Sequence, residues 1–144
     1  MRYRVGGGAA LFAAIASSAC GITEPIEDRL IGIVDQEEGV PVVSVPGQVV
    51  AGQEFEVTIR TVGGGCVRKG DTEVEVVGGT ATVTPYDRFA LPRPGLGCLP
   101  TAETFQHTAP VTFPDAGDAV VVVRVREQGS DEPIGLRFPV SVVP

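Results

Sequence analysis

The amino-acid sequence predicts an all-β protein, a β-sandwich of seven to eight short antiparallel strands. Short runs rich in valine and other strand-forming residues are separated by glycine- and proline-rich turns about every 8 to 12 residues, as is typical of sandwiches. Several runs alternate apolar with polar residues, which is the period of a strand with one buried face. After residue 28, no segment shows the period of about 3.6 residues that marks an amphipathic helix.

The strands expected in the first half of the domain alternate most clearly over residues 54–62. There Phe55, Val57 and Ile59 point to one side, and charged or polar residues point to the other. Gly78 and Gly79 separate two alternating runs, and because glycine readily adopts a positive φ they predict a tight hairpin. The strands expected in this half cover residues 30–34, 41–45, 54–62, 73–77 and 80–84.

Three further strands are expected in the second half, over residues 104–113, 119–126 and 134–142. Before them, residues 86–103 are predicted to form a long loop, because this stretch is rich in proline and glycine. The side chains expected to face the core are Phe105, His107, Ala109, Val111, Phe113, Val121, Val123, Val125, Ile134, Leu136, Phe138, Val140 and Val142.

Two segments resemble bacterial immunoglobulin-like domains: residues 50–57, and residues 113–118 ahead of the valine-rich strand. The resemblance covers residues 41–144 and implies an immunoglobulin-like sandwich. The sequence departs from antibody domains in having no tryptophan and no tyrosine two residues before a cysteine on a late strand. A shared fold of this kind implies little about activity.

The first 20 residues have the order of features found in a secretory signal. Arg2 and Arg4 precede an apolar run over residues 9–16, and small residues follow up to Cys20. The apolar run is shorter than the roughly 20 residues that a membrane-spanning helix needs. Residues 1–19 are therefore predicted to be a removable signal peptide helix, followed by a tether over residues 20–29 and a single domain over residues 30–144.

The segment Ser17-Ser18-Ala19-Cys20 resembles the lipobox of bacterial lipoprotein precursors. This resemblance implies that the Cys20 thiol is diacylated and that signal peptidase II cuts before it. The family prefers leucine where this chain has Ser17, and an ordinary secreted protein cut near Ala19 is the alternative. Several acyl chains, at about 0.8 kcal/mol per buried methylene, hold a small protein stably on a membrane. The residue after Cys20 is Gly21, whereas an aspartate at this position is linked to inner-membrane retention of lipoproteins in some bacteria. The glycine therefore favours an outer membrane where one exists.

The charge balance limits the partners of the exported protein. Removal of the signal takes away Arg2 and Arg4, so the 11 basic residues fall to nine against 18 acidic residues, a net charge of −9. Such a protein repels nucleic-acid phosphates, so no nucleic-acid partner is expected. Membrane attachment is therefore assigned to the lipid and not to a basic patch.

Cys66 and Cys98 remain once Cys20 is assigned to the lipid, and in an oxidising compartment two cysteines most simply form one disulfide. Closing the loop of about 30 residues between these cysteines stabilises the fold by about 3–4 kcal/mol in the chain-entropy model. His107, the only histidine, could in principle activate one of these thiols. We favour a strand histidine with a satisfied ring, because the disulfide consumes both thiols. No metal or other cofactor is expected, since no close ligand pair such as CxxC is present.

Asp71, Glu73 and Glu75 stand at alternate positions, and on a strand their carboxylates would share a face. Three carboxylates could bind Ca²⁺. We favour a solvated face balanced across the sheet by Arg60 or Arg124.

The disulfide is expected to bring the region after Cys66 close to the 86–103 loop. Possible partner-binding residues there are Arg68, Lys69, Tyr86, Arg88 and Phe89, because aromatic residues and arginine dominate binding hot spots. Alternatively, the two aromatic residues cap the core and the charges pair locally; both interpretations stay open.

No catalytic constellation is found, so the expected function is that of a non-enzymatic binding or structural module on a cell-envelope membrane. Its expected partner is an envelope protein or a surface polymer, and the protein is expected to be monomeric. The first alternative is an inhibitor of an exported hydrolase that presents the 86–103 loop. The second is an enzyme that uses Cys66, Cys98 or His107.

Overall fold

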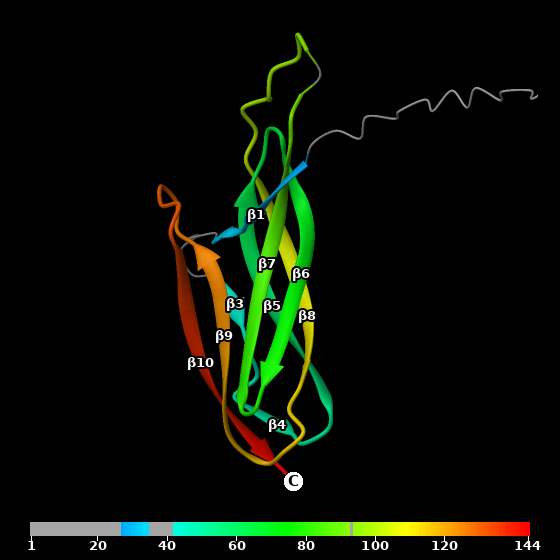
Figure 1. The fold of residues 1–144 in the computed structure, drawn as a ribbon, viewed down its shortest axis with the longest axis vertical. Coiled ribbons are helices and arrows are strands. Elements are labelled where there is room, and N and C mark those ends of the chain that lie inside the picture. The colour runs from blue at the N-terminus through cyan, green and yellow to red at the C-terminus, as the bar shows by residue number, and fades with distance from the viewer. Residues whose placement is uncertain (1–26, 35–41, 93) are drawn as a thin grey trace, which may run out of the picture.

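The computed structural model describes residues 27–34, 42–92 and 94–144, and this part contains β-strands and no helix (Figure 1). Its strands are β1 (Glu27–Ile31), β2 (Ile33–Val34), β3 (Val43–Ser44), β4 (Gln48–Val50), β5 (Glu54–Gly63), β6 (Val67–Val77), β7 (Thr80–Ala90), β8 (Glu103–Thr112), β9 (Gly117–Arg126) and β10 (Pro133–Val143). The all-β prediction is confirmed. The predicted signal peptide, Cys20 and residues 21–26 lie outside the described residues.

The strands form two facing layers that are joined into one hydrogen-bonded sheet (Figure 1). In one layer, β5 pairs with β8 along its whole length, and β3 lies on its other edge. In the other layer, β6, β7, β9 and β10 are neighbours, and β4 is added to β10. The short strand β2 joins the layers because it pairs with both β5 and β9. The arrangement agrees with a β-sandwich.

The direction of some strands differs from the antiparallel arrangement expected from the sequence. β7 runs parallel to β9 over residues 80–83, and β4 runs parallel to β10. Alternation of polar and apolar residues determines which side of a strand is buried, but it carries no information about neighbours or direction. The parallel pairing of β7 with β9 distinguishes this topology from the two antiparallel sheets of an immunoglobulin domain.

The core consists mainly of small, branched side chains that the alternation predicts to face inward. Phe55 stacks on Phe113 across the β5 end of the core, with ring centroids 5.8 Å apart. Valine dominates because β-branched side chains pack well on a pleated surface. The buried apolar residues are Val34, Val49, Val57, Ile59, Ala81, Val83, Ala109, Val111, Phe113, Val121, Val123, Val125, Val140 and Val142.

The two ends of the sandwich carry different connections (Figure 1). At the lower end, Gly78 and Gly79 join β6 to β7 in the predicted tight hairpin, with Val77 paired to Thr80 and Gly78 at a φ of 57°. The C-terminus lies at the same end. The start of β1 and the loop between β7 and β8 lie at the upper end.

The loop between β7 and β8 is shorter than predicted, because residues 86–90 are part of β7. They pair with β1 on one side, from Tyr86 opposite Ile31 to Ala90 opposite Glu27, and with β6 on the other. β1 itself begins inside the segment predicted to be a tether. We call residues 91–92 and 94–102 the stapled loop.

Candidate functional site

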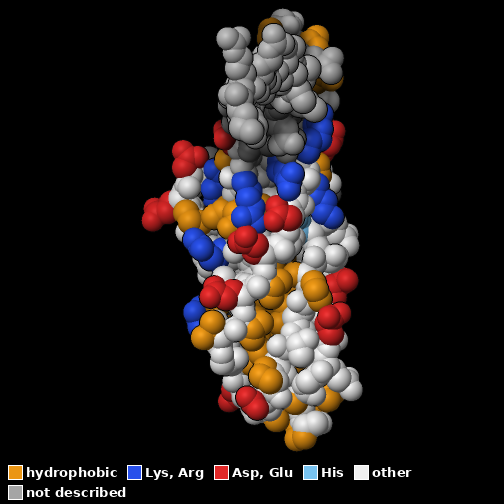
Figure 2. All heavy atoms as spheres, turned by 45° about the vertical axis from the view of Figure 1, so that its right-hand side comes forward, with side chains coloured by type: hydrophobic (Ala, Val, Ile, Leu, Met, Phe, Trp, Pro, Cys, Tyr) orange, Lys and Arg blue, Asp and Glu red, His pale blue; other side chains and the backbone are white. Residues whose placement is uncertain are grey.

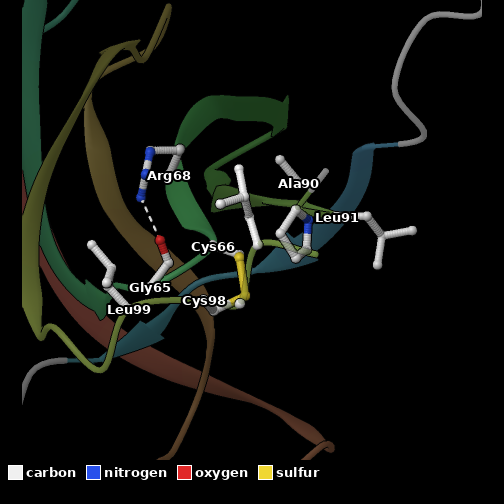
Figure 3. Close-up of a pocket in the computed structure, with 10 residues that line it drawn as sticks. Gly65, Cys66, Arg68, Ala90, Leu91, Cys98 and Leu99 are labelled. Carbon is white, nitrogen blue, oxygen red and sulfur yellow. Dashed lines mark hydrogen bonds between the residues drawn. A yellow bond between two sulfur atoms is a disulfide. The ribbon is translucent and has the colours of Figure 1, made fainter. Parts of the chain in front are cut away.

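A disulfide between Cys66 and Cys98 fastens the stapled loop to the turn between β5 and β6, as predicted. The two Cα atoms are 5.2 Å apart, within the range that a disulfide spans without backbone displacement. Figure 3 shows the bond between the two segments, with Leu91 and Leu99 on either side of it. Both cysteines are consumed, so neither supplies a thiol for catalysis or metal binding.

Glycines next to Cys66 allow the stapled loop to lie directly against the β5–β6 turn. Gly64 and Gly65 have positive φ angles of 134° and 64°. A Cβ atom on Gly64 would overlap the carbonyl oxygen of Thr101. The Gly65 amide also donates a hydrogen bond to Thr101 Oγ1 at 3.2 Å. Gly64 and Gly65 therefore form a closely packed contact with the stapled loop.

The stapled loop exposes leucine side chains around a shallow hollow. Leu91, Leu96 and Leu99 are 61%, 64% and 71% exposed. They line a hollow of about 300 Å³ together with the disulfide and Arg68 (Figure 3). The Nη1 atom of Arg68 donates to the carbonyl oxygens of Gly65 and Val67, each at 2.9 Å, so its side chain is held along the turn.

The residues predicted to bind a partner lie on strands and not in the loop. Arg68 and Lys69 belong to β6, where they stand opposite Arg88 and Asp87 of β7, and Phe89 stands opposite Val67. The expected proximity of the two segments is confirmed by this register. The placement of Tyr86, Arg88 and Phe89 in the 86–103 loop is wrong, because β1 pairs with this segment and makes it part of β7.

An exposed ionic cluster lies on the outer face of β1, β6 and β7. Arg29 Nη2 lies 2.6 Å from Asp71 Oδ2 and 2.8 Å from Glu73 Oε1, and its guanidinium carbon lies 3.5 Å from the centre of the Tyr86 ring. We call these four residues the outer cluster. The sequence named Arg60 or Arg124 as the balancing cation. Arg29 is the cation in contact with both Asp71 and Glu73, because β1 brings it across β7 to β6, and Arg88 Nη2 lies 3.9 Å from Asp71 Oδ1. Arg124 lines a hollow together with Glu73 and Glu75.

The charges of the outer cluster shift two pKa values. The hydrogen bond to Glu73 is the main cause of a raised pKa for Arg29. Partial burial raises the pKa of Asp71, but the hydrogen bond and the charge of Arg29 outweigh it, so the pKa lies below its usual value. Two of the three carboxylates that were considered as Ca²⁺ ligands, Asp71 and Glu73, thus hold a guanidinium. Among the described residues, no group of three or more His, Cys, Asp or Glu side chains could hold a metal ion.

A second polar cluster is buried between the layers. His107 of β8 is fully buried, as its place on the inward face predicts. Its Nε2 atom lies 3.1 Å from both Asp87 Oδ1 and Thr61 Oγ1, and its Nδ1 atom lies 3.1 Å from Thr72 Oγ1. We call these four residues the inner cluster. The preference for a strand histidine with a satisfied ring is confirmed, and no solvent reaches this ring.

Two participants in these clusters were missed from the sequence. Arg29 lies in the segment predicted to be a tether, because the apolar run over residues 30–34 begins only after it. Asp87 lies in a segment predicted to be a loop. The alternation Tyr86-Asp87-Arg88-Phe89 is a weak strand signal in which the inward position is occupied by a carboxylate, contrary to the usual pattern.

Comparison with known proteins returned no match: no protein-family model, no curated protein and no solved structure matches this chain. In the part of the chain that the structure describes, no helix is long and apolar enough to cross a membrane.

Proposed function

We propose that the protein is anchored to a bacterial envelope membrane by a lipid on Cys20, and that its β-sandwich is a non-enzymatic binding or structural module. The observation that carries the proposal is the place where the sandwich begins. β1 starts at Glu27, opposite Ala90 and directly beside the stapled loop. Six residues separate Glu27 from Cys20, a reach of at most about 25 Å when extended. The stapled end is then the membrane-facing end.

The positions of the reactive side chains support a binding role over catalysis. Cys66 and Cys98 are joined to each other, and His107 is enclosed in hydrogen bonds without access to a substrate. A binding surface at the stapled end needs only exposed side chains on a fixed frame, which the disulfide and the glycine contact provide. The net charge of −9 after signal removal argues against a nucleic-acid partner.

The likeness to immunoglobulin domains stays part of this proposal. Residues 43–50 support the likeness, because this short segment crosses from one layer to the other. Its first strand, β3, pairs with β5 in one layer, and its second strand, β4, pairs with β10 in the other layer. The parallel pairing of β7 with β9 is the feature that departs from that arrangement.

Mass spectrometry of the mature protein tests the anchor. The full chain, made in a bacterium with a lipoprotein pathway, should have an N-terminus at Cys20 that carries acyl chains, and it should fractionate with membranes. The Cys20→Ser chain is the matched control and should lose both properties. An unacylated N-terminus at Cys20 in the parent protein, released in soluble form, would contradict the proposal. Co-purification of the lipidated protein from its own envelope then identifies any protein or polymer partner.

Inhibition of an exported hydrolase is a second candidate, favoured by the exposed leucines on a covalently fastened loop. If this candidate holds, Leu96→Asp and Leu99→Asp should abolish inhibition of the target while leaving the thermal midpoint unchanged. Alanine at Tyr86, Arg88 and Phe89 should have a smaller effect, because these residues lie on β7 and not in the loop. Unchanged inhibition in the leucine variants would reject it.

A further inference from the structure

The exposed apolar side chains of the protein are unevenly distributed. Among the described residues, the large hydrophobic side chains that remain exposed are the three leucines of the stapled loop and, at the opposite end, Val76 and Val77. Single exposed leucines are ordinary on a protein surface, but three on one short loop form an apolar surface that water solvates poorly. The loop therefore presents a surface suited to an apolar environment.

The short connection to Cys20 indicates which environment lies within reach. Glu27 pairs with Ala90, the residue directly before Leu91. If Cys20 carries the lipid, the six residues between it and β1 keep the start of the stapled loop within about 25 Å of the membrane surface. Figure 1 shows the loop extending beyond the strands at the end where β1 begins. The loop then stands between the sandwich and the membrane.

The loop is also fastened in a way that favours contact with a surface. The disulfide at Cys98 and the contact of Gly64 and Gly65 with Thr101 both hold the second half of the loop against the β5–β6 turn. An ordered loop loses little conformational entropy when it binds.

Basic residues accompany the leucines at this end, although the protein as a whole is acidic. Arg68 and Lys69 lie at the start of β6. Arg88 stands opposite Arg68 near the end of β7, where its Nη2 atom lies 3.9 Å from Asp71 Oδ1. Figure 2 shows most Lys and Arg side chains of the visible face gathered in its upper half, with acidic side chains among them. Cations beside apolar side chains suit a membrane interface, where the apolar groups enter the acyl boundary and the cations meet lipid phosphates.

From these observations we propose that the stapled loop rests on the lipid surface, with Leu91, Leu96 and Leu99 inserted at the boundary between headgroups and acyl chains. The proposal rests on the lipid anchor proposed above, and it names the envelope component that the stapled end contacts. The loop then acts as a second membrane contact that orients the sandwich, so the Gly78–Gly79 hairpin and the C-terminus point away from the bilayer.

Tryptophan fluorescence tests this orientation, because the chain contains no tryptophan. The Leu96→Trp variant of the full lipidated protein is reconstituted into vesicles of phosphatidylcholine and phosphatidylglycerol with brominated acyl chains, which quench an inserted indole. Val77→Trp is the matched control, since Val77 is 68% exposed at the opposite end. Emission of Leu96→Trp should fall roughly twofold relative to vesicles without bromine and should shift to shorter wavelength, as expected for insertion at the interface. Emission of Val77→Trp should be unchanged.

A further variant distinguishes insertion of the loop leucines into the membrane from mere proximity of the loop to the membrane. Leu91→Asp and Leu99→Asp, added together to Leu96→Trp, should abolish most of the quenching without releasing the protein from vesicles, because the acyl chains remain. Vesicle flotation, measured on every sample, reports the anchor separately from the loop.

Failure of the anchor and failure of the loop contact give different results. A parent protein that does not float with vesicles contradicts the anchor. A protein that floats while Leu96→Trp and Val77→Trp are quenched equally, or not at all, overturns the loop proposal and leaves the anchor intact. A wavelength shift of Leu96→Trp that requires envelope extract, and is absent in protein-free vesicles, overturns it as well and assigns the leucines to a protein partner.

Discussion

The inner and outer polar clusters lie on opposite faces of β6 and β7, and they differ mainly in burial. The inner cluster joins Asp87 of β7 to His107 of β8 between the layers, and Asp87 is 3% exposed. The outer cluster joins Asp71 of β6 to Arg29 of β1 on the surface, and the Asp71 side chain is 48% exposed. In each cluster, an aspartate carboxylate lies at hydrogen-bond distance from a nitrogen atom of a histidine or arginine side chain.

The comparison shows that burial, more than residue type, determines how much a polar pair contributes to stability. Water solvates Asp71 when its partner is lost, so an exposed pair contributes little. Water cannot take the place of His107 beside Asp87, so the loss of His107 leaves an unsatisfied buried carboxylate. We therefore expect the inner cluster to affect folding, and the outer cluster to have only a small, salt-dependent effect.

The largest expected effect is that of Asp87→Ala. It removes the buried carboxylate that lies 3.1 Å from His107 Nε2, so the free energy of unfolding should fall by about 3–5 kcal/mol. Urea unfolding followed by circular dichroism measures this. Asp118→Ala, at the exposed start of β9, is the control and should change stability little. A loss below about 1 kcal/mol for Asp87→Ala would show that the inner cluster behaves like a surface pair.

Gly32→Ala disturbs the same cluster by crowding it. An added Cβ would lie 2.5 Å from Thr61 Cγ2 and 3.1 Å from Asp87 Oδ2, so both side chains must move. We expect a loss of about 1–3 kcal/mol in the free energy of unfolding, typical of an overpacked site. The control is Gly47→Ala, which has nothing within 4 Å of the added atom. Equal stability of the two variants would contradict the packing described around Gly32.

The outer cluster should respond weakly to Asp71→Asn. The exposed ion pair with Arg29 contributes little to the stability of the fold, and added salt screens it further. The measurement is urea unfolding at low and high ionic strength. The difference in the free energy of unfolding between the parent protein and Asp71→Asn should be smaller at high salt. Glu75→Gln, two residues beyond Glu73 on the same face, is the matched control. A difference that grows in salt would reject the ionic interpretation.

The smallest expected effect is the change, in acid, of the stability difference between the parent protein and Asp71→Asn. The pKa of Asp71 is lowered in the folded protein, so its stabilising contribution is fully present above its unfolded pKa of about 4. The contribution is lost as the pH falls through the lower folded pKa. Unfolding curves of the parent and of Asp71→Asn should therefore converge in acid. Curves that stay equally separated below about pH 3 would contradict the assigned shift.

Regular alternation made much of the fold predictable. Val57 and Ile59 on β5, and the valines of β9, are buried as expected, because a residue's place in an alternating strand determines its side. The hairpin at Gly78 was predictable for a local reason, the positive φ that glycine permits. Once Cys20 was set aside as the predicted lipid site, counting the remaining cysteines was enough to pair Cys66 with Cys98.

The candidate site was only partly predictable. The sequence indicated that a loop fastened by Cys98 carries the exposed surface, but it assigned Tyr86 and Arg88 to that loop. Both lie on β7, because a segment more than 50 residues earlier in the chain pairs with them as β1. Periodicity within one segment contains no information about a partner so distant in sequence.

The sequence by itself determined the strand faces, the glycine turn and the disulfide, because each depends on local geometry or on the chemistry of a single residue type. Only the tertiary structure decided that Arg29 reaches Asp71, that Asp87 meets His107 inside the sandwich, and that the exposed leucines lie beside the start of β1. These contacts depend on which strands become neighbours, and that choice is made by packing the whole core.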